Sequence, residues 1–283
     1  MSLRRICCIF APKFMRVRIH RQFLLAALTT LALLFPPLLL PLQAASPSGD
    51  GKPVFTLVLD AGHGGKDPGA LGRKKGREKN INLAVALAVG RLIEQNLKDV
   101  KVIYTRKTDV FVELDERARI ANKAKADLFV SIHTNALPGR AQARGSETYT
   151  LGMHRAADNL EVAKRENSVI SLERDYENRY EGFDPKSSES YIIFEFMQDR
   201  NMEQSVRLAT LIQKQFRSAG RPDKGVHQAG FLVLRATSMP SCLIELGYIT
   251  TATEEAYLTS DRGVRELANS IYQAIKKYKE THQ

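Results

Sequence analysis

The chain has 283 residues, of which 43% are apolar and 26% are charged, and its formal net charge is +11. This length and apolar content predict a folded globular protein with a sizeable core. Six of the cations precede the first acidic residue, so most of the excess charge belongs to the amino-terminal segment, and a nucleic-acid-binding protein is not indicated.

The first 45 residues predict a secretory signal. Basic residues come first, an apolar run follows at 23–42, and the small residues QAAS come next. A transmembrane anchor is the alternative, because a run of 20 residues is long enough to cross a bilayer of roughly 30 Å. Three prolines near the end of the run, Pro36, Pro37 and Pro41, argue against an anchor because they would break a helix there. We therefore expect cleavage and export rather than a membrane-tethered form.

Removal of residues 1–45 lowers the formal charge from +11 to +5, because this segment carries six cations and no anion. Cys7 and Cys8 leave with the signal, and Cys242 remains as the single cysteine of the mature chain. An internal disulfide is then excluded, so the exported protein must depend on its core or on a metal for stability.

After a short linker at residues 46–53, strand-like and helix-like patterns alternate along the chain. The predicted strands are 54–60, 100–106, 127–136, 145–151, 230–236 and 241–250, with 145–151 expected to be more exposed than the others. The predicted helices are 79–96, 113–126, 202–220 and 263–280. This alternation predicts a single α/β domain over 54–281, with a twisted, mostly parallel sheet and helices on both faces.

Residues 153–202 interrupt the alternation. They are rich in charge and contain one convincing helix, at about 156–173, and a second candidate turn at 191–199. Irregular connections of this length are uncommon unless they are functional, so we interpret the segment as a functional insertion.

Two histidines follow predicted strands at the edge where ligands gather in open parallel sheets. His63 lies in LVLDAGHGGKDPGA, directly after the first strand, and His133 lies near the end of LFVSIHTN. A histidine packed in the core is the alternative for His133. Glycines around His63 leave its imidazole accessible, which favours a metal ligand. A phosphate-binding loop is the alternative for this stretch, but GHGGKDPG has neither the Walker nor the dinucleotide-binding spacing.

Two glutamates extend this constellation. Glu78 opens the first long helix and is the best candidate for a third ligand, although an acid favoured by the helix dipole is the alternative. Glu245 interrupts the buried apolar strand CLIELGYIT, where an unpaired carboxylate would cost several kcal/mol. Glu245 is therefore a candidate for the proton-transferring group, with a structural salt bridge as the alternative.

Four sequence segments, taken in order, resemble the zinc-dependent N-acetylmuramoyl-L-alanine amidases of Gram-negative envelopes. They are DAGHGGKDPGA, REKN, SIHTNA and IELGYIT, and the resemblance covers about residues 54–280. It implies a twisted α/β sheet with flanking helices and one Zn²⁺ per chain, held by His63, Glu78 and His133. It also implies that Glu245 is the catalytic acid and base, and Asn135 is a candidate orienting group.

The activity implied by the resemblance is cleavage of the amide between the lactyl group of N-acetylmuramic acid and the L-alanine of the stem peptide. The implied setting is the periplasm, in cell-wall remodelling and daughter-cell separation. Two alternatives remain at this point: a zinc peptidase acting on stem peptides, and a catalytically silent protein that binds the wall or an activator.

The insertion resembles the regulatory segment of that family, which covers the site until an activator moves it. Glu166 in KREN is the candidate inhibitory contact to zinc, and a solvated charged face is the alternative. The apolar group YIIFEFM is then a hinge or an activator surface. The implied partners are peptidoglycan and a division-associated activator with an inactive metallopeptidase-like domain. We expect a monomer that does not bind nucleic acid, and deletion of residues 153–202 is expected to raise hydrolysis of cell wall.

Overall fold

The computed structural model describes residues 55–281 apart from 138, 140–141, 155 and 196–199. The predicted signal at 1–45 and the linker at 46–53 lie outside the described residues, as does the end of the candidate turn at 191–199. Within the described part of the chain, no helix is both long enough and apolar enough to cross a membrane.

A six-stranded sheet forms the centre of the domain, with the strand order β2-β1-β3-β6-β4-β5. Neighbouring strands are parallel except at the junction of β6 and β4, which is antiparallel. This confirms the predicted mostly parallel sheet. The strands are β1 (Phe55–Ala61), β2 (Val100–Tyr104), β3 (Leu128–Asn135), β4 (Ser146–Leu151), β5 (Asp223–Ala229) and β6 (Ser241–Tyr248).

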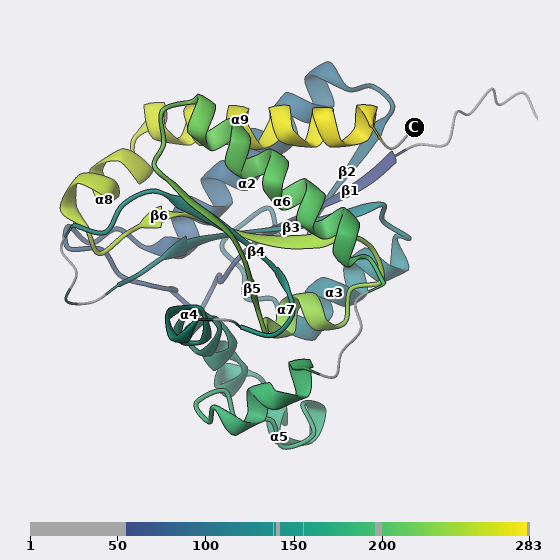
Figure 1. Cartoon of the computed structure of the whole chain (residues 1–283), viewed down its shortest axis with the longest axis vertical. Coiled ribbons are helices and arrows are strands. Elements are labelled where there is room, and N and C mark those ends of the chain that lie inside the picture. Colours follow the sequence, from purple (N-terminus) through teal and green to yellow (C-terminus); the bar gives the residue numbers. More distant parts are fainter. Residues whose placement is uncertain (1–54, 138, 140–141, 155, 196–199, 282–283) are drawn as a thin grey trace, which may run out of the picture. The chain divides into compact units, whose positions relative to one another are not determined.

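Helices cover both faces of the sheet, as predicted (Figure 1). Alternation along β1 sends Leu57 and Leu59 into one core and Val58 into the other. The first core contains apolar residues of three long helices, α2 (Glu78–Asn96), α6 (Met202–Ser218) and α9 (Asp261–Glu280). On the opposite face lie α3 (Leu114–Lys123), α4 (Ala157–Asn167) and α7 (Leu232–Arg235), while α8 (Ala252–Leu258) follows β6.

Local sequence explains why the last helix starts where it does. The hydroxyl of Ser260 accepts a hydrogen bond from the backbone N–H of Gly263, which caps α9. Beyond the cap, Leu267, Ile271 and Ile275 recur at helical spacing and are fully buried. The predicted amphipathic helix is therefore present in the fold, with its apolar side buried.

Two strand predictions were wrong. Residues 230–236 do not form a strand, because Leu232–Arg235 is the short helix α7, and the strand of this region is β5, immediately before it. The sequence of β5, DKGVHQA, has few apolar residues, so periodicity did not reveal it. The strand at 145–151 is not exposed either, because all residues of β4 are buried between β6 and β5.

The insertion packs against the sheet domain. It contains α4, η1 (Ser168–Leu172), α5 (Tyr176–Arg179) and η2 (Glu189–Glu195), so the predicted helix at 156–173 is an α-helix continued by a 3₁₀ turn. Its buried residues Ile170, Tyr191 and Phe194 share a core with Phe231 of the sheet domain. Deleting residues 153–202 would expose this core, so point substitutions test the role of the segment more cleanly.

Candidate active site

The two predicted histidines meet at the carboxyl edge of the parallel strands. His63 lies two residues beyond the end of β1, and His133 lies near the end of the neighbouring strand β3. Their imidazole ring centroids are 4.9 Å apart. Only 8% of His63 and 5% of His133 is exposed, so both rings are shielded from bulk water.

The loop that carries His63 has an unusual backbone. The φ angle of His63 is 61°, a left-handed conformation that costs a non-glycine residue about 1–3 kcal/mol. Two buried arginines stabilise it through the loop carbonyls: Arg117 donates to the carbonyl of His63, and Arg106 donates to that of Gly62. Gly62 is required here, because a Cβ atom at this position would lie 2.3 Å from His133 Nε2.

Glu78 is the first residue of α2, as predicted, and it is fully buried. Its Oε1 atom lies 3.1 Å from His63 Nε2 and 3.3 Å from His133 Nδ1. The backbone N–H groups of Ala70 and Thr134 donate to its two carboxylate oxygens at 2.8 Å each. These bonds orient the carboxylate toward both imidazoles.

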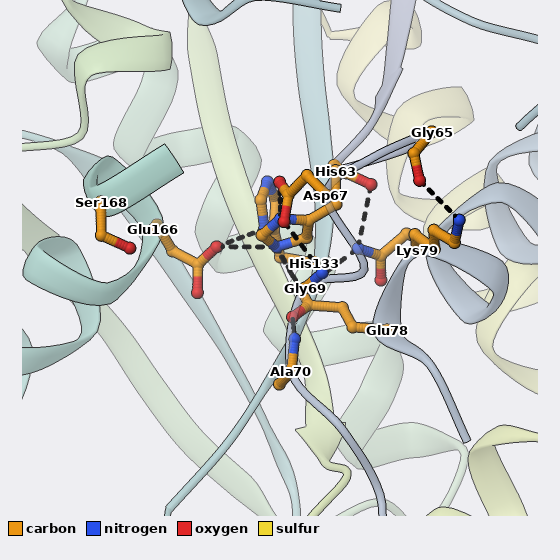
Figure 2. Close-up of polar contacts among 12 residues, drawn as sticks. His63, Gly65, Asp67, Gly69, Ala70, Glu78, Lys79, His133, Glu166 and Ser168 are labelled. Carbon is orange, nitrogen blue, oxygen red and sulfur yellow. Dashed lines mark hydrogen bonds and ion pairs between the residues drawn. The ribbon is translucent and has the colours of Figure 1, made fainter. Parts of the chain in front are cut away.

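The insertion supplies a fourth group to this cluster. Figure 2 shows Glu166 pointing toward the two imidazoles, with its Oε2 atom 3.1 Å from His63 Nε2 and 2.8 Å from His133 Nδ1. One ligand atom from each of His63, Glu78, His133 and Glu166 lies within 4.8 Å of the other three.

The residues of this cluster fit a tetrahedral divalent metal. In zinc sites the bonds to nitrogen and oxygen are about 2.0–2.2 Å, so neighbouring ligand atoms are roughly 3.3 Å apart. The nitrogen-to-oxygen separations here are 2.8–3.3 Å. Among the described residues, His63 Nε2, His133 Nδ1 and Glu166 Oε2 are buried atoms without a hydrogen-bond partner. Such atoms are costly unless a cation binds them.

Glu245 lies beside this cluster on β6, where it is the register partner of His133. It is fully buried, and neither carboxylate oxygen has a hydrogen-bond partner among the described residues. The nearest cation is Arg165 of α4, whose Nη2 atom lies 3.7 Å from Glu245 Oε1. The salt bridge considered as an alternative role for Glu245 is therefore present, but its cation, Arg165, belongs to the insertion and not to the sheet domain.

The electrostatic surroundings suit proton transfer at Glu245. Burial and the nearby Glu166 carboxylate raise the pKa of Glu245 well above the ordinary range of a glutamate, against the opposing effect of Arg165. A strongly perturbed carboxyl group beside a candidate metal centre is typical of an acid–base catalyst. By contrast, burial would raise the pKa of Glu78, but His63 holds it below its ordinary value, so Glu78 remains an anionic ligand.

Asn135, the candidate orienting group, ends β3 two residues beyond His133 and is buried. Its amide donates to Glu147 Oε1 at 2.6 Å and its oxygen accepts from Arg165 at 2.9 Å. It therefore lies beside Glu245 rather than within the ligand cluster.

One residue of the site was not assigned from the sequence. Asp67 Oδ2 lies 2.6 Å from His63 Nδ1, while its Oδ1 atom accepts from the N–H of Gly69 (Figure 2). Because Nδ1 is bound to a carboxylate, the ring of His63 is oriented with Nε2 toward Glu78. The spacing of four residues within a glycine-rich turn did not reveal this contact, which depends on the left-handed backbone at His63.

Replacing Asp67 tests this orientation. We expect Asp67→Ala to weaken metal binding by about 10–100-fold, as for other carboxylates that orient a ligating histidine. Asp67→Asn retains an oxygen acceptor and is expected to lose less. Competition with a fluorescent zinc chelator measures both affinities, and equal affinities for parent and Asp67→Ala would contradict the assignment.

A second group of acids, Glu113, Asp115 and Glu173, also has ligand atoms within 4.8 Å of one another. Arg179 lies among them, bound to Glu113 and 3.4 Å from Glu173. This guanidinium already compensates the acidic charge, so the cluster is an ion-pair network that fastens α5 to the start of α3.

Comparisons with known proteins agree with this geometry. A family model described as N-acetylmuramoyl-L-alanine amidase matches residues 57–277. The N-acetylmuramoyl-L-alanine amidase AmiC of Escherichia coli O6:H1 is 33% identical over 237 residues, which cover 82% of this chain and 54% of AmiC. The chain thus spans about half the length of that relative.

Solved structures show the same relation. The catalytic domain of CwlV, an N-acetylmuramoyl-L-alanine amidase from Bacillus (Paenibacillus) polymyxa, is 32% identical with a TM-score of 0.58, covering 80% of this chain and 98% of that domain. The CwlD amidase from Clostridioides difficile, solved in complex with the GerS lipoprotein, is 26% identical with a TM-score of 0.59, covering 80% of this chain and 99% of CwlD. On the extent of the family match and the identity to these relatives, the chain belongs to the N-acetylmuramoyl-L-alanine amidase family.

Proposed function

We propose that this chain is a peptidoglycan hydrolase that cleaves the amide between the lactyl group of N-acetylmuramic acid and the L-alanine of the stem peptide. Membership of the amidase family supports the reaction class. The observation that carries the proposal is the convergence of His63 Nε2, His133 Nδ1 and a Glu78 oxygen, with a buried Glu245 on the next strand.

We infer that His63, Glu78 and His133 hold one Zn²⁺ per chain. Bound zinc polarises a carbonyl group and lowers the pKa of bound water to about 7. The three side chains come from separate elements that already place their ligand atoms together, so the site is preorganised for the ion.

Glu245 is assigned the proton transfer. Its carboxylate, whose ionised form a neighbouring Zn²⁺ would favour, accepts a proton from the attacking water and returns it to the leaving nitrogen. The buried position on β6 excludes bulk water from this exchange. Asn135 contributes an oriented amide oxygen at the same side of the site, consistent with an orienting role.

The products of purified sacculi test the reaction. Incubation of zinc-loaded protein with sacculi is expected to release free, intact stem peptides that mass spectrometry identifies. Shortened stems would indicate a peptidase instead. If a variant that lacks the Glu166 contact binds sacculi but releases no fragment, the chain is a silent wall-binding protein.

We also infer that α4 holds the enzyme inactive. Glu166 contributes a carboxylate oxygen to the ligand group at the position that water or substrate needs in a catalytic site. Asn167 fastens the end of α4 by donating to the carbonyl of Gly230 at 2.7 Å and accepting from Leu232. An activator must therefore supply enough binding energy to displace these contacts.

Glu166→Ala is expected to raise the rate of sacculus hydrolysis by about 10–100-fold. This range follows from the roughly 1.5–3 kcal/mol that a charge-assisted contact contributes, with each 1.4 kcal/mol equal to a factor of ten. Glu161→Ala is the matched control, because Glu161 lies on the same helix with 68% of its side chain exposed. Dye release from labelled sacculi measures both rates, and equal rates for Glu166→Ala and Glu161→Ala would contradict inhibition by Glu166.

The remaining assignments belong to the same proposal. Residues 54–281 form the catalytic domain, and residues 153–202 form its regulatory insertion. The expected location is the periplasm, reached through a signal at residues 1–45, and the expected partner is a division-associated activator. The structure of CwlD in complex with a lipoprotein supports recruitment by a partner. Ile192 and Ile193, which are 52% and 44% exposed on η2, are the apolar surface that we assign to this contact.

A further inference from the structure

Two cavities border α4. The smaller, of about 370 Å³, is lined by two candidate metal ligands, His63 and Glu78, together with Arg165 and Glu166. The larger, of about 630 Å³, lies over the β4–β5 side of the sheet, and none of the metal ligands or Glu245 lines it. Its walls include Asn135, Glu147, Tyr149, Lys224, His227 and Tyr248.

The order of the strands relates this larger cavity to the reacting groups. In the sheet, β6 lies between β3 and β4, and Glu245 is the register partner of His133 on one side and of Glu147 on the other. Register partners project from the same face of a sheet. Glu245 therefore lies between the candidate metal ligands and the larger cavity.

This strand order indicates which way the substrate extends across the sheet. When an amide is hydrolysed, its carbonyl group lies at the candidate metal site, and its leaving nitrogen lies beside the group that protonates it. Since that group is Glu245, the part of the substrate attached to the nitrogen continues from Glu245 toward β4 and β5. In the proposed reaction this part is the stem peptide.

Asn135, in the wall of the larger cavity, presents a hydrogen-bond acceptor in a fixed orientation. Asn135 donates its amide N–H to Glu147 Oε1 at 2.6 Å, and Tyr248 donates its hydroxyl to the same atom at 2.8 Å. Because the amide nitrogen of Asn135 donates to Glu147 Oε1, the amide oxygen is directed away from β4. The carbonyl oxygen of Ala136 lies next in the chain.

Arg165 of α4 now supplies donors to these acceptors. Its Nη2 donates to Asn135 Oδ1 at 2.9 Å and its Nη1 donates to the carbonyl of Ala136 at 2.8 Å. The same Nη2 lies 3.7 Å from Glu245 Oε1. When α4 moves away, the two neutral acceptors need other N–H donors, and leaving them unpaired would cost affinity.

We propose that the larger cavity binds the stem peptide, and that Arg165 occupies the positions of the peptide N–H donors. Peptide N–H groups then donate to Asn135 Oδ1 and to the Ala136 carbonyl, and Lys224 contacts a carboxylate of the peptide. This inference rests on the proposed amidase function. It also identifies a second competitor on α4: Glu166 contacts the metal ligands, whereas Arg165, which lines the smaller cavity, reaches Asn135 in the wall of the larger one.

Binding of a small probe tests this assignment separately from catalysis. The probe is an N-acyl-L-alanyl tripeptide, prepared once with a free C-terminal carboxylate and once with a C-terminal amide. The protein is the full chain carrying Glu245→Gln, which is expected not to hydrolyse the probe. NMR titration with each probe measures affinity in this parent and in further variants.

Four results are expected. Adding Arg165→Ala strengthens binding of both probes by about tenfold, whereas Lys164→Ala on the same helix does not. In the Arg165→Ala protein, Asn135→Ala weakens both probes by about tenfold. Lys224→Ala weakens only the probe with the free carboxylate, by up to about fivefold, since Lys224 is exposed. Lys214→Ala on α6 changes neither affinity.

The proposal would be overturned if the Arg165, Asn135 and Lys224 variants each bound both probes with the same affinity as the protein from which they were made. Tight binding of a peptide-free N-acetylglucosamine oligomer that is lost in the same variants would also overturn it, because the cavity would then hold glycan. Release of intact stems from sacculi without these binding effects refutes only the peptide subsite. Release of shortened stems with these binding effects refutes only the amidase function and supports the subsite.

Discussion

Replacing Glu245 by glutamine is expected to lower kcat on sacculi by about 10²–10⁴-fold, the contribution of a positioned general acid and base. Glutamine has nearly the same volume as glutamate, so the buried position on β6 remains filled. The candidate metal ligands are untouched, and zinc content is expected to stay at one ion per chain. Activity within about threefold of the parent, at equal zinc content, would show that another group transfers the proton.

The Glu245→Gln substitution is also expected to change how the stability of the protein depends on pH. The pKa of Glu245 is raised well above 4.5 by burial and by Glu166, so the folded protein retains a proton there that the unfolded chain has lost. Above about pH 4.5 the contribution of this group to stability therefore falls as pH rises, until its folded pKa is passed. Glutamine does not titrate.

We accordingly expect the metal-free Glu245→Gln protein to gain stability relative to the metal-free parent as pH rises. Urea unfolding of both proteins between pH 4.5 and 8 measures this difference. A difference that stays constant, or that changes in the opposite direction, would contradict a raised pKa. Glu161→Gln on the exposed face of α4 is the control for the loss of one carboxylate.

Removing a metal ligand is expected to have the second large effect. Glu78→Gln replaces the carboxylate that faces both imidazoles with an amide, a much weaker zinc ligand. Loss of the ion removes several kcal/mol of transition-state stabilisation, and 4 kcal/mol corresponds to about 10³ in rate. We therefore expect hydrolysis to fall on the order of 10³-fold and bound zinc to be lost on dialysis.

Thermal unfolding provides a readout of the Glu78 assignment that does not depend on activity. An ion that binds only the folded state at a free concentration 100 times its Kd stabilises that state by about 2.7 kcal/mol. Zinc is therefore expected to raise the Tm of the metal-free parent and to leave that of Glu78→Gln nearly unchanged. An equal rise in both proteins would remove Glu78 from the ligand set.

Much of the scaffold was predictable because its signals are local. Apolar runs indicated β1, β3 and β6, and apolar residues at helical spacing indicated α2, α6 and α9. The failures have a shared cause. The polar sequence of β5 becomes a strand by pairing with β4, and β4 is buried because it is an inner strand with α6 packed on one face and α7 on the other. Tertiary contacts decided both, and they leave no periodic pattern in the sequence.

The contact between α4 and the candidate site was predicted only in part. KREN marked Glu166, but nothing in the sequence indicated that the preceding Arg165 contacts Asn135 and Ala136, about thirty positions away. Adjacent residues on α4 project in directions about 100° apart, so Glu166 reaches the candidate metal ligands and Arg165 reaches Asn135 and Ala136. The position of the helix on the sheet determines which residue faces which group.

By itself, the sequence determined which residue types stand after which strands: His63 after β1, His133 and Asn135 at the end of β3, Glu78 at the start of α2 and Glu245 within β6. Only the tertiary structure decided the distances among them, the orientation of His63 by Asp67, and the placement of α4 over the site. The physical reason is that composition and periodicity act over a few neighbouring residues, whereas ligand geometry depends on strand order, register and a strained turn. These arise only when segments far apart in the chain pack together.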